Sequence, residues 1–261
     1  MANKKIGFYG KLESTANNKV ENLYIIVNNK SIVFVVKHII NNEFVAVEHF
    51  EQGDETNSWS PLLAYLQNNS SLIQNYYKNI LFVINSNRLI LSQTDAKDNL
   101  LSAAQELELI HGHKLDEEIY TSLIGNKHFL IYAVTDSLNT ILTRYFPAGK
   151  WHHYASFFLE NIYETEVQVR IFEDSFLVYI IENGMTKLLN YYPIESEEQN
   201  IYTLLNSCIN AGIDTNKFLL KVWGYEEEKH MFITKTAPYF SAKQIIQIEQ
   251  VPNAYSSYFI V

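Results

Sequence analysis

The feature of this sequence that most restricts its fold is an order of predicted elements that occurs twice. In the first half, three short runs rich in Val, Ile, Phe and Tyr precede an amphipathic helix and a buried fourth strand. The same order recurs about 144 residues later. The predicted elements of the first copy are Leu23–Asn28, Ser31–His38, Glu43–Glu51, a helix that starts at Ser60-Pro61, and Asn79–Asn85. Those of the second copy are Glu166–Phe172, Ser175–Ile181, Lys187–Tyr192, a helix over Ser196–Ala211, and Lys217–Trp223.

Further elements are predicted between the two copies. Asp95–Glu108 has helical spacing, His128–Val134 is a strand, and a helix from Thr135 is ended by Pro147-Ala148-Gly149. Apolar residues of 151–163 then share one helical stripe. Together these elements predict an α/β protein of two tandem ribonuclease H-like lobes, with mixed sheets in βββαβαβ order. This is the architecture of the actin-like ATPase fold. We expect a polar lead-in over 1–21, a first lobe over 22–163 and a second over 164–261.

Asparagine and glycine mark the predicted hairpin turns. Asn28-Asn29-Lys30 and Ile40-Asn41-Asn42 separate the three strands of the first copy. Those of the second copy are joined by Glu173-Asp174 and by Asn183-Gly184. Asparagine tolerates positive φ, which tight hairpin turns use. We therefore interpret the two asparagine segments of the first copy as hairpin turns with positive φ.

Three stretches resemble a known bacterial family, domain of unknown function family 3822. They are a segment that combines Phe-Pro, histidines and small residues (Phe146–Ser156), a third-strand segment of the second lobe (Gly184–Asn190), and the start of the helix after it (Ile201–Leu205). The resemblance covers most of the chain from about residue 20. It implies an actin-like ATPase fold and brings no established activity.

The residues that could hold a nucleotide are few. In an actin-like ATPase the first hairpin of each lobe wraps phosphate, which calls for glycines and for backbone N–H groups that face the oxygens. Neither hairpin contains a glycine here, and two adjacent carboxylates in the second would repel phosphate unless a metal intervened. The candidate cleft residues are Asn28, Asn29, Lys30, Glu173, Asp174 and Gly224. Because the phosphate-binding glycines are missing, the pattern disfavours ATP hydrolysis, and Lys30 is more simply a solvated turn residue.

No metal centre is predicted. A ribonuclease H-like nuclease needs converging carboxylates, whereas Glu173, Asp174, Glu197, Glu198 and Glu226–Glu228 lie at turns and helix starts, where solvated acids are common. The pairs His111/His113 and His152/His153 lack a nearby cysteine or acid at ligand spacing, so we interpret them as surface residues. Cys208, the only cysteine, lies on an apolar helical stripe and is expected to be a buried small hydrophobe.

Charge and hydropathy limit the partners. The net charge of −9 disfavours nucleic acid. Apolar runs are far shorter than the roughly 18 residues of a membrane span, and no signal peptide is recognisable, so we expect a cytoplasmic protein without membrane contact.

The function favoured by the sequence is a non-catalytic binding or assembly module with a protein partner or self-association, and without catalytic residues or a cofactor. Part of an aromatic surface that includes Tyr191, Tyr192, Tyr255 or Tyr258 is one candidate for the contact. The alternative is a divergent nucleotide-binding ATPase or small-molecule kinase that binds ATP and Mg²⁺ in an inter-lobe cleft. A third interpretation is a homo-oligomer formed through edge strands.

Overall fold

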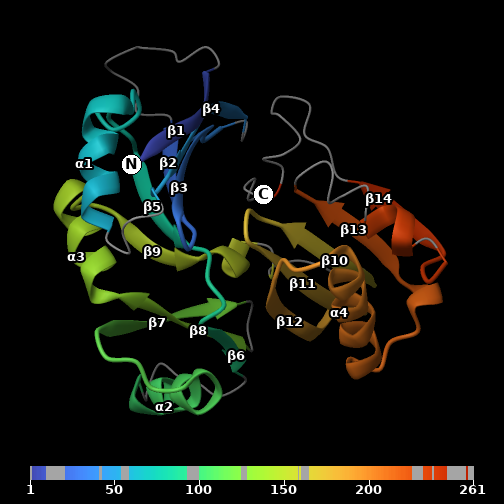
Figure 1. Ribbon diagram of the computed structural model, residues 1–261. Helices are drawn as coiled ribbons and strands as arrows, with labels where there is room; N and C mark the ends of the chain where they lie inside the picture. Colours follow the sequence, from blue (N-terminus) through green and yellow to red (C-terminus); the bar gives the residue numbers. More distant parts are fainter. Residues whose placement is uncertain are drawn as a thin grey trace. The chain divides into compact units, whose positions relative to one another are not determined.

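The computed structural model describes residues 2–9, 21–40, 43–53, 59–92, 100–124, 128–157, 159, 165–224, 232–236, 238–245 and 257. The chain divides into two compact units, Met1–Ser156 and Phe157–Val261 (Figure 1). The predicted lobe boundary, between residues 163 and 164, lies outside the described residues and stays a prediction.

The first unit is built on a six-stranded mixed sheet in the order β1-β4-β3-β2-β5-β9. The neighbours among β1 to β4 pair antiparallel, whereas β5 runs parallel to both β2 and β9. The first copy of the predicted strands is present as β2 to β5. One edge strand, β1, falls in the predicted lead-in, where sequence patterning assigned no element. The strands are β1 (Asn3–Tyr9), β2 (Glu21–Val27), β3 (Ser31–His38), β4 (Phe44–Glu51), β5 (Asn79–Ile84) and β9 (Lys150–His153).

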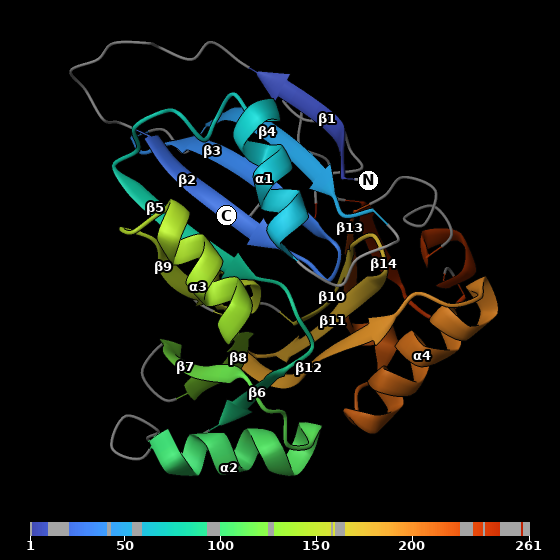
Figure 2. The same cartoon turned by 60° about the vertical axis from the view of Figure 1, so that its left-hand side comes forward.

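Two helices cover one face of this sheet, α1 (Trp59–Asn69) and α3 (Asp136–Tyr145) (Figure 2). Leu62, Leu63 and Leu66 of α1 are buried, as the predicted helical face requires. Phe50 of β4 packs edge-to-face between Phe34 and Tyr65, with ring centroids 6.0 and 6.3 Å apart.

A small subdomain is inserted between β5 and α3. Its three strands are in the order β6-β8-β7, and α2 packs on one face around Leu107, Phe129 and Ile131. Arg88 binds the end of α2 through its guanidinium, which donates to the carbonyls of His111 and Gly112 at 3.1 and 3.3 Å. The elements are β6 (Leu89–Ser92), α2 (Leu100–His111), β7 (Glu117–Ile124) and β8 (His128–Thr135). Without this insertion and β1, the first unit reads βββαβαβ.

The predicted helical stripe over 151–163 is wrong in its first part. Lys150–His153 is strand β9, and Tyr154–Phe157 is a short 3₁₀ helix, η2. Two tertiary contacts outweigh the helical spacing: β9 pairs with β5, and Trp151 packs on Phe82 with ring centroids 5.0 Å apart. The rest of the stripe lies outside the described residues, except for residue 159.

The second unit repeats the order on a five-stranded sheet, β12-β11-β10-β13-β14. After β13 a helical turn over 232–236 precedes β14, which completes βββαβαβ. Asn183 and Gly184, at the predicted junction of the second and third strands, turn the β11–β12 hairpin with φ values of 51° and 75°. The turn predicted at Ile40-Asn41-Asn42 lies, at Asn41 and Asn42, outside the described residues. The elements are β10 (Glu166–Ile171), β11 (Ser175–Glu182), β12 (Met185–Pro193), α4 (Glu197–Asn210), η3 (Thr215–Lys217), β13 (Leu219–Trp223) and β14 (Ala242–Ile245).

The alternation of apolar and polar residues along β10 places its apolar residues against α4. Val167, Val169 and Ile171 are fully buried in one cluster with Leu204 and Cys208 of the helix. Helix α4 begins after Ser196, whose hydroxyl accepts a hydrogen bond from Gln199 N. The prediction that Cys208 is a buried apolar residue is confirmed, and burial raises the pKa of its thiol to about 12.

Candidate functional site

The first candidate segment is the turn between β2 and β3. Asn28 N donates to Ser31 O at 2.9 Å, and Gln52 N donates to Lys30 O at 2.8 Å. The Asn28 side chain also works inside the turn: its Nδ2 donates to Ser31 Oγ at 2.8 Å, while its Oδ1 accepts from Asn85 Nδ2 at 2.8 Å. Asn28 and Asn85 are buried, so this amide holds the turn together.

The predicted positive φ is wrong for this turn. Among the described residues, positive φ occurs outside glycine only at Asp116 and Asn183. The side-chain bonds of Asn28 explain the difference, because they fix the turn without the conformation that a tight glycine turn uses. Asn29 and Lys30 are exposed at the tip.

The second candidate segment is the turn between β10 and β11. Phe172 N donates to Ser175 O at 2.8 Å, and Ile194 N donates to Asp174 O at 2.9 Å. These bonds repeat those of the first turn, position for position, about 144 residues later. The backbone supports the predicted internal repeat, but the turn residues differ: Glu173 and Asp174 bring carboxylates where the first turn has Asn29 and Lys30.

Gly224, which follows β13, has a structural reason to be glycine. Its φ is +120°, and a Cβ at this position would lie 2.4 Å from Ile171 O. The backbones therefore approach too closely for any side chain. Close packing inside the second unit accounts for this glycine without a nucleotide.

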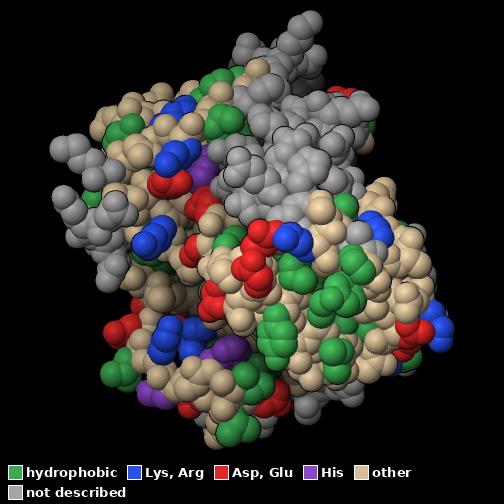
Figure 3. Space-filling view, turned by 45° about the vertical axis from the view of Figure 1, so that its right-hand side comes forward, with side chains coloured by type: hydrophobic (Ala, Val, Ile, Leu, Met, Phe, Trp, Pro, Cys, Tyr) green, Lys and Arg blue, Asp and Glu red, His purple; other side chains and the backbone are tan. Residues whose placement is uncertain are grey.

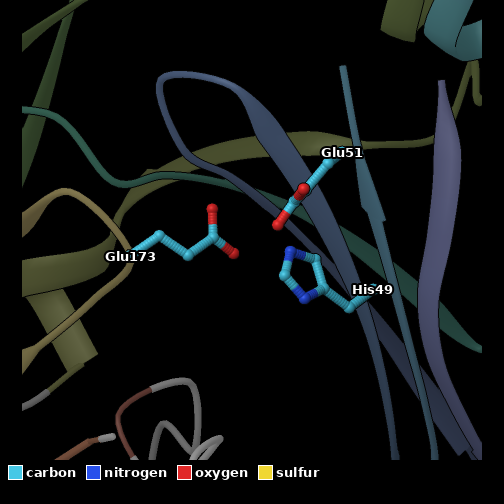
Figure 4. A group of neighbouring side chains, drawn as sticks. All are labelled: His49, Glu51 and Glu173. Atoms are coloured by element: carbon cyan, nitrogen blue, oxygen red, sulfur yellow. The ribbon is translucent and has the colours of Figure 1, made fainter. Parts of the chain in front are cut away.

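Two residues that sequence reasoning missed are His49 and Glu51. Both lie on β4, and the two-residue period of a strand places them on one face, with ligand atoms within 4.8 Å of each other (Figure 4). Figure 4 also draws Glu173, which belongs to the second unit. Glu51 is paired with Lys5 Nζ at 2.9 Å. The signal that could have found the two residues is the His-x-Glu alternation inside the predicted strand 43–51.

Three of the four paired histidines contact backbone groups or an acid, and the fourth, His152, is half-buried. His153 is fully buried, so its interpretation as a surface residue is wrong. Its Nδ1 accepts from Ala155 N at 3.0 Å, so Nε2 carries the proton and donates to Ser86 O at 3.0 Å. Burial lowers the pKa of His153 to about 4, and the ring is neutral. His111 Nε2 lies 3.0 Å from Leu89 O, and exposed His113 lies 2.6 Å from Glu108.

The second sheet carries a row of polar residues on the face opposite α4, which includes Gln168 and Arg170. Glu166 pairs with Lys221 and accepts a hydrogen bond from Gln168 Nε2. Arg170 donates to Gln168 Oε1, and its guanidinium lies 4.4 Å from the Trp223 ring centroid. The residues of β10 in this row are buried, and neighbouring groups compensate their charges.

The acids at the start of α4 fit the prediction of solvated helix-start residues. Glu197 and Glu198 are exposed in the first turn, where they complement the helix dipole, and Glu197 pairs with Lys235 at 3.2 Å. Glu226–Glu228 lie outside the described residues.

Among the described residues, exposed large hydrophobic side chains occur in both units. Figure 3 shows them in several separate places on the face in view. Tyr191 is only 7% exposed, and Tyr192 packs on Phe176 with ring centroids 5.6 Å apart, so the predicted aromatic surface is wrong for Tyr191. Tyr255 and Tyr258 lie outside the described residues. None of the described helices is long and apolar enough to cross a membrane.

Comparison with known proteins identifies a family and a fold. The model of a family described as "Protein of unknown function (DUF3822)" matches residues 11–242. No curated protein matches the chain. A Bacteroides thetaiotaomicron protein with an actin-like ATPase fold and unknown function superposes with a TM-score of 0.76 at 17% identity, over 87% of this chain and 91% of that one. This likeness confirms the predicted actin-like fold.

Two other solved structures are similar at a lower level. The cytoplasmic domain of EpsL, an inner membrane component of the type II secretion system of Vibrio cholerae, is 12% identical with a TM-score of 0.47, over 89% of this chain and 86% of that one. The AlfA filament from a B. subtilis plasmid is 10% identical with a TM-score of 0.44, over 91% and 96%. Both TM-scores are too low to support a conclusion.

Proposed function

This chain belongs to the DUF3822 family of proteins of unknown function, and on that premise we propose that it uses its actin-like fold as a non-catalytic binding or assembly module. The observation that carries the proposal is the chemistry of the two hairpin turns. Neither turn contains a glycine or a described residue at positive φ. A phosphate-wrapping loop depends on that conformation to direct backbone N–H groups at the ligand.

The first turn is stabilised by its own side chains. Asn28 donates its backbone N–H and its side-chain amide to Ser31, and accepts a bond from Asn85. A ligand that recruited Asn28 would have to break these buried bonds, which is unfavourable because each group would lose its partner away from water. The turn is therefore built to hold its own shape.

The second turn supports the same proposal through charge. Glu173 and Asp174 place two carboxylates next to each other, and like charges repel phosphate at short range. The alternative function, a nucleotide-binding ATPase or small-molecule kinase, would need Mg²⁺ to bridge these carboxylates to the phosphates. Gly224, the remaining candidate for a nucleotide site, has its own explanation in the close approach to Ile171 O.

Thermal unfolding with ATP, ADP and GTP, each with and without Mg²⁺, separates the two functions. We expect the melting temperature to stay unchanged at millimolar nucleotide. A ligand that binds only the native state at a hundredfold excess over Kd would add about 2.7 kcal/mol, which is readily seen. A Mg²⁺-dependent rise that Glu173→Gln abolishes would overturn the proposal and establish the nucleotide site. Glu182→Gln, a surface substitution in the same unit, is the matched control.

A further inference from the structure

The edge strand β1 is held to its sheet by little apolar burial. It pairs antiparallel with β4 from Asn3 opposite Glu51 to Tyr9 opposite Ala46. Every β1 side chain that the structure describes is exposed or half-exposed. The partner strand is different, because residues 45–50 of β4 are all buried. Main-chain hydrogen bonds and a few polar side chains therefore determine whether β1 stays in place.

One of these polar contacts, made by Glu48, favours a cationic side chain on the partner strand. The carboxylate of Glu48 on β4 has no exposed surface and accepts hydrogen bonds from Lys4 Nζ at 2.6 Å and from Tyr9 OH, both on β1. Its other donors are Ser71 N at 3.2 Å, Ser71 Oγ at 3.1 Å and Ser70 Oγ. Burial alone would raise the pKa of Glu48, but the hydrogen bonds outweigh it and lower the pKa below its ordinary value.

Glu48 makes the edge of β4 specific for one kind of strand. If β1 leaves, the carboxylate loses its only cationic contact among the described residues, Lys4, while it stays inside the sheet. A replacement strand must therefore bring an amine to the same register. A second amine, Lys5, reaches Glu51 at 2.9 Å near the end of the same strand. The N-terminal strand of this chain carries both groups.

The edge strand β12 of the second unit is less suited to pair with an added strand. Strand β12 has a β-bulge at Lys187, since Ile180 pairs with Leu188 and Ile181 with Thr186. It ends at Pro193, and Tyr191 N is hydrogen-bonded to the Asn190 side chain. Strand β4 also has a bulge, at Val45, so the proline and the Asn190 contact are what distinguish the two edges, because both remove a backbone N–H that an added strand would use. Strand addition is therefore favoured at β4 over β12.

The connection to β1 is long enough for exchange between copies. Eleven residues separate Tyr9 from Glu21, the first residue of β2. At 3.3–3.6 Å per residue, such a segment can extend to about 40 Å. The N-terminal strand of one chain can thus reach the β4 edge of another, where it finds the same Glu48 and the same register.

We propose that β4 is a strand-docking site whose occupant is β1 of a second copy of this chain, so that copies assemble by exchanging their N-terminal strands. The inference deepens the proposed function, because it names the partner of an assembly module as the chain itself. It also identifies which edge strand forms the contact: β4 accepts the strand and β1 supplies it.

Disulfide trapping between two singly substituted chains tests the exchange. Asn3→Cys in one chain and Glu51→Cys in another place thiols at directly opposite residues, which have the separation a disulfide needs. Cys208 is buried and does not compete. The two chains, of different mass through a tag, are mixed, oxidised with oxidised glutathione and separated without reductant. We expect a covalent dimer that contains one chain of each kind.

Two controls fix the meaning of this result. Glu43→Cys, just before β4, replaces Glu51→Cys as a thiol far from the register, and its mixed dimer with Asn3→Cys should be at least about tenfold less abundant, since only docked thiols have a high effective concentration. The double variant, with both cysteines on one chain, must form the disulfide between positions 3 and 51. A double variant that cross-links only within one chain, with no mixed dimer from the single variants, overturns the exchange. Failure of the double variant to cross-link overturns it as well.

A charge swap gives a second, independent readout. Lys4→Glu chains have like charges at the contact between positions 4 and 48, and so do Glu48→Lys chains. If strands exchange, mixing the two variants restores opposite charges at this contact, because β1 of each variant then docks on β4 of the other. Light scattering should show mixed dimers that neither variant forms alone, and no gain on mixing counts against the exchange.

The charge swap and the trapping are independent of nucleotide binding. A chain that stays monomeric in both experiments and shows no nucleotide-dependent melting shift loses this inference and keeps its non-catalytic assignment. A chain that exchanges strands and also melts later with Mg²⁺ and nucleotide keeps the inference and loses that assignment. The failure of one proposal is therefore distinguishable from the failure of the other.

Discussion

Asn85 Nδ2, just after β5, donates a hydrogen bond of 2.8 Å to Asn28 Oδ1, just after β2. A second asparagine pair joins the other ends of these two strands: Asn79 Nδ2 donates to Asn22 Oδ1 at 2.9 Å. The two pairs have the same chemistry and the same chain separation, but only the first is buried. An asparagine pair therefore joins β2 and β5 at each end, with one pair buried and the other exposed to solvent.

The buried pair, Asn28 and Asn85, is expected to contribute much more to stability than the exposed pair. Asn85→Ala removes this hydrogen bond to Asn28 Oδ1 in a buried position, so we expect a loss of about 1–3 kcal/mol in the free energy of unfolding. Asn79→Ala is the matched control and should lose less than about 0.5 kcal/mol, because water replaces the lost partner. Urea denaturation of both variants measures the difference. Equal losses would show that Asn85 does not hold the first turn.

Gly149 is a second position where a small change is expected to matter. An added Cβ would lie 2.1 to 2.5 Å from three ring atoms of Phe82, and that ring is buried. Gly149→Ala therefore requires Phe82 to shift, and we expect destabilisation of about 1–3 kcal/mol by urea denaturation.

A second substitution at this contact is expected to restore part of the lost stability. Phe82→Leu removes the ring atoms that the new methyl group meets, so the double variant should be more stable than the sum of the single effects predicts, with a coupling of about 1 kcal/mol. Additive effects would mean that Gly149 is constrained by something other than Phe82.

The periodicity of apolar residues was sufficient to predict most of the fold, because most strands and helices have a recognisable apolar pattern within their own sequence. The strands β2 to β5 and β10 to β13 alternate or are continuously apolar, and α4 has helical spacing. Strands β1, β6, β7, β9 and β14 were not predicted, and two of them show the part that tertiary contacts play. Strand β1 contributes few buried side chains, and β9 is too short for a pattern and is held by β5 and Phe82.

The candidate site was predicted only in outline, for a related reason. The residues of both turns follow from where the predicted strands end. Their roles depend on partners that are distant in sequence, such as Asn85 for Asn28 and the Ile171 carbonyl for Gly224. The buried state of His153 likewise depends on the Ser86 carbonyl, which no local pattern indicates.

The lowered pKa of Glu48 predicts how the stability of the protein changes in acid. Its folded pKa is lowered, so its contribution is fully present above the ordinary pKa of about 4.3 and is lost as the pH falls through the lower folded value. Wild type should therefore lose stability steeply below pH 4.3, measured by urea denaturation along a pH series. Glu48→Gln should be less stable at pH 7 and have a shallower slope in this window. An unchanged slope would mean that other carboxylates control acid unfolding.

His153 predicts a second pH dependence, in a separate window. Its folded pKa of about 4 lies below the ordinary value of about 6.5, so the unfolded chain binds the proton more readily between these values. The stability that neutral His153 provides is present above pH 6.5 and is lost as the pH falls towards 4, by about 2 kcal/mol between pH 7 and pH 5. His153→Gln cannot titrate and should lose this slope, while the slope below pH 4.3 that we assign to Glu48 remains. The ring signals of His153 in an NMR titration give the direct check: a midpoint near 6.5 in the folded protein would show that the ring is accessible to protons and that the bonds to Ala155 N and Ser86 O do not hold it neutral.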